Sequence, residues 1–189
     1  MASFTITPDL IEFSSKGGSA TIQIQDAPAF GVSYTTSGNT NKFVIGDFGQ
    51  EDTAPMNTRG TNTTNGEYRC SIKYVNNMDP SDYVEVTLVQ YAGVMTVDPS
   101  TVSLSYISGD SERITVDGPG TITASTSYNW LSSRRITESE LGFETWEISA
   151  TTSNTGSSDR TGSVTFADNI SAKWMSTEEG QVRSGGIIV

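Results

Sequence analysis

Residues 5–24 read TITPDLIEFSSKGGSATIQI, and a similar stretch, TVDPSTVSLSYISGDSERITV, occupies residues 96–116. Each copy has a proline, two alternating apolar positions, a turn that contains glycine, and a second pair of alternating apolar positions. The matched positions are Ile6, Pro8, Ile11, Phe13, Gly18, Ile22 and Ile24 in the first copy and Val97, Pro99, Val102, Leu104, Gly109, Ile114 and Val116 in the second, with one residue inserted after the turn. Alternating apolar residues on both sides of a turn predict strand, turn and strand, written twice.

The distance between the two copies indicates the domain organisation. Solenoid repeats are about 20 to 50 residues long, whereas these copies lie about half of the 189-residue chain apart. Half a chain of this length can bury a core of its own. We therefore expect two similar β domains in tandem, residues 1–92 and 93–189.

The composition favours an all-β fold. Only 34% of the residues are hydrophobic, and 18 are glycine. The apolar residues alternate with polar ones, as in thin cores between two sheets. The best helical candidate, residues 138–143, is too short to be stable alone.

The formal net charge of −11 argues against two classes of partner. Nucleic-acid-binding proteins gather Lys and Arg on one face, and anionic membrane surfaces also attract basic segments. No apolar run approaches the roughly 20 residues that a membrane-spanning helix needs. We expect neither nucleic acid nor membrane as a partner.

The sequence has no histidine, which removes the commonest general base and every zinc site that uses imidazole. Grouped polar side chains remain: Asp47 with Glu51 and Asp52, Glu138 with Glu140, and Asn76 and Asn77 with Asp79 and Asp82. Carboxylates of one exposed loop do not flank a sugar from opposite sides as a glycosidase requires, and their spacing matches no calcium loop. We expect no enzymatic activity, no metal and no cofactor.

Several single features indicate core or surface positions. Cys70 and Trp146 alternate with apolar neighbours, so both are expected in a core. Trp174 has no obvious core face and is a candidate for stacking on a sugar ring. Residues 46–66 show almost no apolar periodicity and are expected to form a long loop excursion.

The last residues predict a surface for partner binding. Alternation decays from residue 167 onward, and residues 185–189 read GGIIV. An extended β-branched segment can add a strand to the open edge of a neighbouring sheet through backbone hydrogen bonds. The candidate partner-binding residues are Gly185, Gly186, Ile187, Ile188 and Val189, together with Trp174.

A wider pattern joins both halves. The residues that carry it are Pro8, Phe13, Gly17, Gly18 and VTLVQ (86–90) in the first, and Pro99, Leu104, Gly109, Trp130, Leu131, Ser158, Arg160, Gly162, Val164 and Phe166 in the second. This pattern resembles the BACON domain of gut bacterial proteins and their phages. The resemblance implies two tandem immunoglobulin-like β-sandwich domains, with Trp130 in a core, and specifies architecture more than function.

The chain departs from the BACON pattern in three places. The first half has Phe43 and Val44 where the second has Trp130 and Leu131. Residues 46–66 have no counterpart in the pattern, and the second half lacks the closing strand of apolar residues, Thr and Gln. We therefore expect these edges to be remodelled for contact with a partner.

Three functions stay open from the sequence. The first is a non-enzymatic accessory protein of a bacteriophage virion, as a head decoration or a fibre-associated protein, whose partners are capsid or fibre proteins. It is favoured because the first residues lack the basic and apolar segments of a secretory signal. The alternative is a carbohydrate- or mucin-binding module of a gut bacterial protein, secreted or at the cell surface, with its leader removed. The third is a spacer.

Overall fold

The computed structural model of the chain describes residues 3–49, 51–170 and 178–184. The chain divides into two compact units, Met1–Gly93 with Glu140–Gly142, and Val94–Ser139 with Phe143–Val189. Apart from one turn of 3₁₀ helix, η1 (Thr40–Lys42), every regular element in the described ranges is a β-strand. The all-β class predicted from alternation is confirmed.

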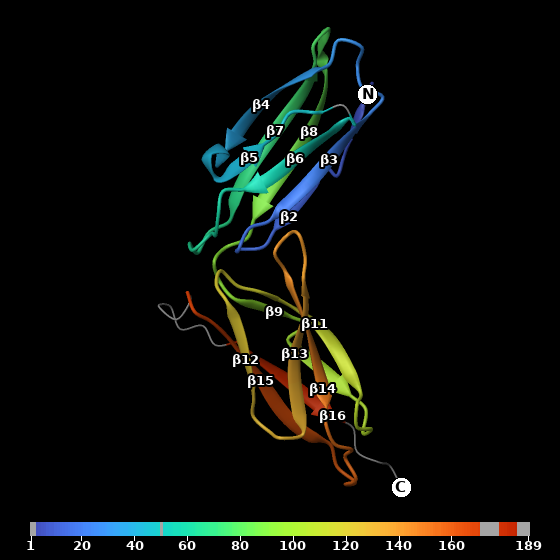
Figure 1. The fold of residues 1–189 in the computed structure, drawn as a ribbon, viewed down its shortest axis with the longest axis vertical. Coiled ribbons are helices and arrows are strands. Elements are labelled where there is room, and N and C mark those ends of the chain that lie inside the picture. The colour runs from blue at the N-terminus through green and yellow to red at the C-terminus, as the bar shows by residue number, and fades with distance from the viewer. Residues whose placement is uncertain (1–2, 50, 171–177, 185–189) are drawn as a thin grey trace. The chain divides into compact units, whose positions relative to one another are not determined.

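The first unit has eight strands in two sheets. The strands are β1 (Thr5–Thr7), β2 (Leu10–Phe13), β3 (Ser19–Gln25), β4 (Val32–Gly38), β5 (Phe43–Ile45), β6 (Thr53–Thr58), β7 (Tyr68–Asn76) and β8 (Asp79–Gln90). One sheet has the order β1-β3-β6-β5 and the other β2-β8-β7-β4 (Figure 1).

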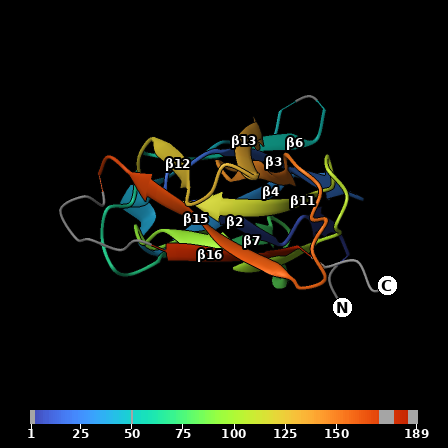
Figure 2. The ribbon, with the colours of Figure 1, turned by 90° about the horizontal axis from the view of Figure 1, so that it is seen from below.

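The second unit repeats this arrangement. Its strands are β9 (Thr96–Asp98), β10 (Thr101–Leu104), β11 (Ser111–Asp117), β12 (Ile122–Thr126), β13 (Leu131–Glu138), β14 (Glu144–Ala150), β15 (Arg160–Asp168) and β16 (Glu178–Ser184). The sheets have the orders β9-β11-β14-β13 and β10-β16-β15-β12, so each strand matches the strand eight places earlier. Figure 2 shows β11 and β16 in separate layers.

The strand order identifies the type of sandwich. Immunoglobulin-type domains place strands A, B, E and D in one sheet and C, F and G in the other. Strand A is split in both units: β1 pairs with β3 antiparallel, and β2 then pairs with β8 in parallel in the opposite sheet. β9 and β10 divide in the same way between β11 and β16. The chain therefore folds as two tandem immunoglobulin-like β-sandwiches.

Each unit has a core of its own, to which the alternating residues of the repeat contribute. Ile6 faces Ile24 between β1 and β3, and Val97 faces Val116 between β9 and β11. All of the matched isoleucine, valine, leucine and phenylalanine positions are buried. Burying each such side chain stabilises the fold by about 1.5–3 kcal/mol, so the repeat contributes substantially to the packing of the two sheets.

The turn of the repeat differs from the predicted alignment. Gly17 (φ 92°) and Gly109 (φ 89°) both adopt a left-handed conformation, which favours glycine. Gly109 therefore matches Gly17 rather than Gly18, and the inserted residue lies before the turn glycine.

The expected loop excursion over residues 46–66 is wrong. This stretch contains β6, which lies between β3 and β5 in its sheet. Ala54 and Met56 of β6 are fully buried. Pro55 lies between them. Proline has no backbone N–H to donate to a sheet hydrogen bond, so its presence argued against an interior strand in the sequence. β14 is the counterpart of β6, so the stretch is part of the common fold.

A buried asparagine fixes the loop that follows β6. The Asn62 side-chain amide donates to the carbonyls of Gly66 and Tyr91, each at 2.8 Å, and its oxygen accepts from the Thr64 backbone N–H at 3.0 Å. Asn154 has the same place after β14, where it donates to Ser158 O at 2.9 Å. These bonds replace sheet pairing for the loop backbone.

The second unit does have a closing strand, although this strand lacks the pattern of apolar residues, Thr and Gln, as expected. β16 lies between β10 and β15, pairing in parallel with the first and antiparallel with the second. Its sequence, EEGQVRS, contains a single apolar residue, and period-two alternation needs at least two. Pairing with β10 and β15 therefore defines this strand, and its own pattern of apolar residues does not.

Candidate binding hollow of the first unit

The structure does not test the predicted binding residues. Trp174 and Gly185, Gly186, Ile187, Ile188 and Val189 lie outside the described residues. The core predictions can be tested, and they are confirmed: Cys70 is fully buried, and Trp130 and Trp146 are each 7% exposed. Burial raises the pKa of the Cys70 thiol.

Three connections meet at one end of the first unit. They are the β3–β4 connection (26–31), the described part of the β5–β6 connection (46–49 and 51–52) and the β7–β8 turn. The Asn77 side chain of the turn donates to Phe30 O at 2.8 Å, and its backbone N–H donates to Gly31 O at 3.2 Å. Ile24 N–H donates to Asp52 O at 2.9 Å. Loops that a rigid sandwich holds together in this way are common binding surfaces.

The β3–β4 and β5–β6 connections, together with residues of β3, β4 and β7, line a hollow of about 330 Å³. Three aromatic side chains line it: Tyr34 from β4, Phe48 from the β5–β6 connection, and Tyr74 from β7. The ring centroids of Tyr34 and Tyr74 are 5.5 Å apart, and those of Phe48 and Tyr74 are 5.4 Å apart. Tyr74 is 1% exposed, whereas Tyr34 is 37% exposed. The hollow therefore has a buried aromatic base and a partly open aromatic wall.

The Tyr74 hydroxyl is the unusual group of the hollow. It is buried and has no hydrogen-bond partner among the described residues. Burial raises the pKa of Tyr74 well above its usual value, and the neighbouring Tyr34, Asp47 and Cys70 raise it further. The phenol is therefore protonated at neutral pH and can both donate and accept a hydrogen bond.

The charge of the hollow is negative. Among the described residues that line it, the charged ones are Asp47 and Asp52. Both side chains are exposed, and neither takes part in an ion pair or a side-chain hydrogen bond with another residue that the structure describes. Of the acidic group predicted from the sequence, the structure brings these two to the hollow and leaves Glu51 out of its lining.

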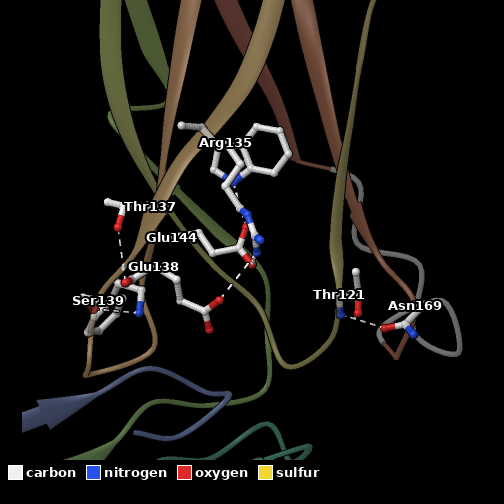
Figure 3. A network of polar contacts seen from close by, with 9 residues as sticks. Thr121, Arg135, Thr137, Glu138, Ser139, Glu144 and Asn169 are labelled. Atoms are coloured by element: carbon white, nitrogen blue, oxygen red, sulfur yellow. Dashed lines mark hydrogen bonds and ion pairs between the residues drawn. The ribbon is translucent and has the colours of Figure 1, made fainter. Parts of the chain in front are cut away.

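A second polar cluster, around Glu144 of β14, has a structural character. Glu144 is 1% exposed, and its carboxylate accepts hydrogen bonds from Trp146 Nε1 at 2.9 Å and Arg135 Nη1 at 3.4 Å. Figure 3 shows Arg135 reaching toward both Glu144 and Glu138. Because both oxygens of Glu144 are occupied within the unit, this carboxylate orients the core indole and is not available to a ligand.

A cation rests on an aromatic ring at the same place in each unit. Lys42 Nζ lies 4.7 Å from the Tyr68 ring centroid, and the Arg160 guanidinium lies 4.2 Å from that of Trp130. Sheet registers match Phe43 with Leu131, and not with Trp130 as expected from the sequence, so Lys42 corresponds to Trp130 and Tyr68 to Arg160. In the first unit the cation precedes β5 and the ring lies on β7, whereas in the second unit the ring precedes β13 and the cation lies on β15. Trp130 and Arg160, which carry the BACON resemblance, are thus a packing pair.

The described ranges offer neither a metal cluster nor a membrane-spanning helix. No cluster of three or more His, Cys, Asp or Glu side chains there is placed to hold a metal ion. None of the helical structure in those ranges is long and apolar enough to span a membrane.

Comparisons with known proteins assign this chain to no family. Neither the protein-family models nor the curated proteins give a match to this sequence. Among solved structures, the teleost fish polymeric Ig receptor ectodomain has 14% identity and a TM-score of 0.48, with 98% of this chain and 100% of that chain covered. The Drosophila receptor tyrosine phosphatase DLAR Ig1-2 module has 10% identity and a TM-score of 0.33, with 98% and 99% covered.

A Bacteroides ovatus GH5 xyloglucanase in complex with a XXXG heptasaccharide is also similar in structure, with 20% identity and a TM-score of 0.41 over 51% of this chain and 20% of that one. Two endo-fucoidan hydrolases of glycoside hydrolase family 107 match over 28% and 32% of their own lengths. This chain thus spans a third or less of these three proteins. The strand order, repeated in both units, remains the basis for calling the chain a pair of immunoglobulin-like sandwiches.

Proposed function

We propose that this chain is a non-enzymatic protein that binds a partner through its sandwich modules. The observation that carries the proposal is the hollow of the first unit, where the buried Tyr74 hydroxyl lacks a partner among the described residues. Buried polar groups are nearly always hydrogen-bonded, and a ligand that bonds this hydroxyl recovers the cost of its burial.

A ligand screen by NMR tests this binding role. Small polar and charged compounds are added to the ¹⁵N-labelled full chain, and we expect saturable shifts in residues 26–31 and 46–52. Shifts at those positions that do not saturate with any compound class contradict the proposal for the hollow.

The finer proposal is an accessory protein of a bacteriophage virion, as a head decoration or fibre-associated protein. Its partners are then capsid or fibre proteins. Two observations support it: the resemblance of both halves to the BACON domain, and the net charge of −11, which favours protein partners over nucleic acid. Residues 185–189 are the proposed attachment segment.

Occupancy on purified particles tests the virion proposal. A chain that ends at Ser184 keeps all of β16 and therefore both sheets of the second unit, so a loss of immunogold labelling is attributable to residues 185–189. Equal labelling of both chains removes this segment from the mechanism. Purified particles that lack the full chain contradict the virion location itself.

A carbohydrate- or mucin-binding module, secreted or at a bacterial surface, is the second candidate. The partly exposed ring of Tyr34 at the hollow favours it, because aromatic faces stack on the apolar face of sugars. A glycan array compares Tyr34→Ala and Trp174→Ala with Tyr106→Ala, whose ring is similarly exposed in the other unit. Glycan binding that Tyr34→Ala and Trp174→Ala leave unchanged contradicts this assignment.

A further inference from the structure

We propose that the hollow of the first unit binds a primary alkylammonium group, carried by a lysine side chain or by a free diamine. This inference rests on the binding role proposed for the hollow and specifies the chemistry of its ligand. It is supported by the rings, the carboxylates, the buried phenol and the size of the space.

The aromatic side chains supply the first attraction. A cation is drawn to the faces of aromatic rings, most strongly where water is excluded. Tyr34 and Phe48 are tilted by 52° and 57° against Tyr74, so the three rings are not stacked flat on one another. All three residues line the same space, and Tyr34, which is 37% exposed, offers accessible ring surface to a bound cation.

The carboxylates supply the charge. Asp47 and Asp52 flank the hollow, and no basic side chain belongs to its lining. Each carboxylate is exposed, so water screens its attraction for a cation. Their shared effect is selectivity: they favour a cation over a neutral ligand and repel an anion. The net charge of −11 adds a long-range attraction of the same sign.

The Tyr74 hydroxyl distinguishes between cations. A primary ammonium has three N–H donors, so it can donate to the phenol oxygen and to carboxylates at the same time. A quaternary ammonium has no N–H and leaves the hydroxyl unsatisfied. A neutral alcohol can bond the hydroxyl but carries no charge for Asp47 and Asp52. The primary ammonium is therefore the group that satisfies every polar side chain of the lining.

The size and apolar lining of the hollow favour a side-chain-sized ligand. Its volume of about 330 Å³ is at the lower end of ligand pockets, which span about 300–1,000 Å³. Ile24, Ala27 and Val32 are apolar residues of the lining. An apolar lining of this kind suits the methylene chain that a lysine or diamine places beside its ammonium.

The test is an NMR titration of the ¹⁵N-labelled full chain at constant ionic strength. The probes are n-butylammonium chloride, tetramethylammonium chloride and n-butanol. We expect n-butylammonium to give saturable shifts in residues 26–31 and 46–52, with a dissociation constant on the order of 1 mM. The other two probes should bind at least about tenfold more weakly.

Variants assign the effect to the named side chains. Asp47→Asn with Asp52→Asn should weaken n-butylammonium binding by about tenfold, and Tyr74→Phe by about fivefold. The matched control is Asp9→Asn with Glu12→Gln, which changes the net charge equally at exposed positions outside the hollow. This control should bind as the parent does.

Two further probes separate the sources of the ammonium. Nα-acetyl-lysine methylamide represents a lysine of a partner protein, and 1,5-diaminopentane represents a free diamine. Tighter binding of the lysine derivative assigns the hollow to a protein partner, whereas tighter binding of the diamine assigns it to a small molecule. Either result supports the ammonium assignment.

Three results overturn the inference. They are equal binding of n-butylammonium and n-butanol, unchanged binding in the Asp47 and Asp52 variant, and n-butylammonium shifts that never saturate. If neutral monosaccharides bind the hollow and the ammonium does not, the ligand assignment fails while the binding role stands. If no probe or sugar binds, both fail.

Discussion

Tyr74 is buried, yet its hydroxyl has no hydrogen-bond partner among the residues that the structure describes. Leaving such a group unsatisfied costs about 1–3 kcal/mol, whereas phenylalanine fills the same space without it. Tyr74→Phe should therefore keep the free energy of unfolding at pH 7 or raise it by about 1 kcal/mol. Urea unfolding measures this, and a loss of stability shows that the hydroxyl has a partner in the free protein.

The same residue predicts a dependence on alkaline pH. The pKa of Tyr74 is raised in the folded state, and in the unfolded state it has its ordinary value of about 10. The unfolded chain therefore loses the phenolic proton first, and stability falls as pH rises above about 10. The advantage of Tyr74→Phe over the parent should grow between pH 9 and pH 11. Tyr106→Phe is the exposed control, and an equal pH response of both variants contradicts the prediction.

The exchanged cation–π pairs can be measured against each other. A double-mutant cycle of Trp130→Leu and Arg160→Gln should give a coupling free energy of about 0.5–1 kcal/mol. Lys42→Gln and Tyr68→Leu form the matching cycle in the first unit, with a smaller coupling because Lys42 Nζ is farther from its ring, 4.7 Å against 4.2 Å. Urea unfolding of the variants in both cycles measures the two coupling free energies. If both are zero, the cation–π contact stabilises neither unit, and the contact has not been kept when cation and ring exchanged strands.

At the scale of elements, alternation predicts the strands whose apolar residues face one core. β3 (Ser19–Gln25) is the second strand of the predicted strand, turn and strand, and its alternating residues Ile22 and Ile24 are both buried. β6 was missed because Pro55 interrupts it, and β16 because its pairing with β10 is non-local. Local pattern cannot reveal a strand that long-range neighbours define.

The hollow could not be predicted from the sequence, because its lining also depends on long-range neighbours. The sequence analysis identified Asp47 and Asp52 as acidic neighbours. Tyr34 and Tyr74 come from β4 and β7, which pair with each other in the sheet opposite to that of β5 and β6. Only the folded sandwich brings the three connections together. The one signal available was the enrichment of Gly, Asn and Asp in those connections, which indicates turns but not a shared space.

β16 leads to a prediction for the element itself. It is the interior partner of both β10 and β15, with four and seven paired positions. A chain that ends at residue 177 leaves β10 without a pairing strand and β15 paired only with β12, and it should lose cooperative unfolding of the second unit. A chain that ends at Ser184 is the control and should unfold as the full chain does. Tryptophan fluorescence during urea unfolding measures this, and normal cooperativity without β16 contradicts its role.

At the scale of the whole molecule, the two cores can be observed separately. All three tryptophans, Trp130, Trp146 and Trp174, belong to the second unit, and the single cysteine, Cys70, belongs to the first. Burial covers the Cys70 thiol and raises its pKa, so it reacts with a thiol reagent mainly after the first unit opens. Tryptophan fluorescence thus reports one core and thiol reactivity the other.

This separation predicts independent responses to core mutations. Ile148→Ala in the second core should cost about 2–5 kcal/mol and shift the fluorescence transition to lower urea, while thiol protection of Cys70 stays close to that of the parent. Ile72→Ala in the first core should do the reverse, because each isoleucine packs within its own cluster. If either substitution moves both transitions equally, the two sandwiches unfold as one cooperative body, and the repeat has then produced a single folding unit from two cores.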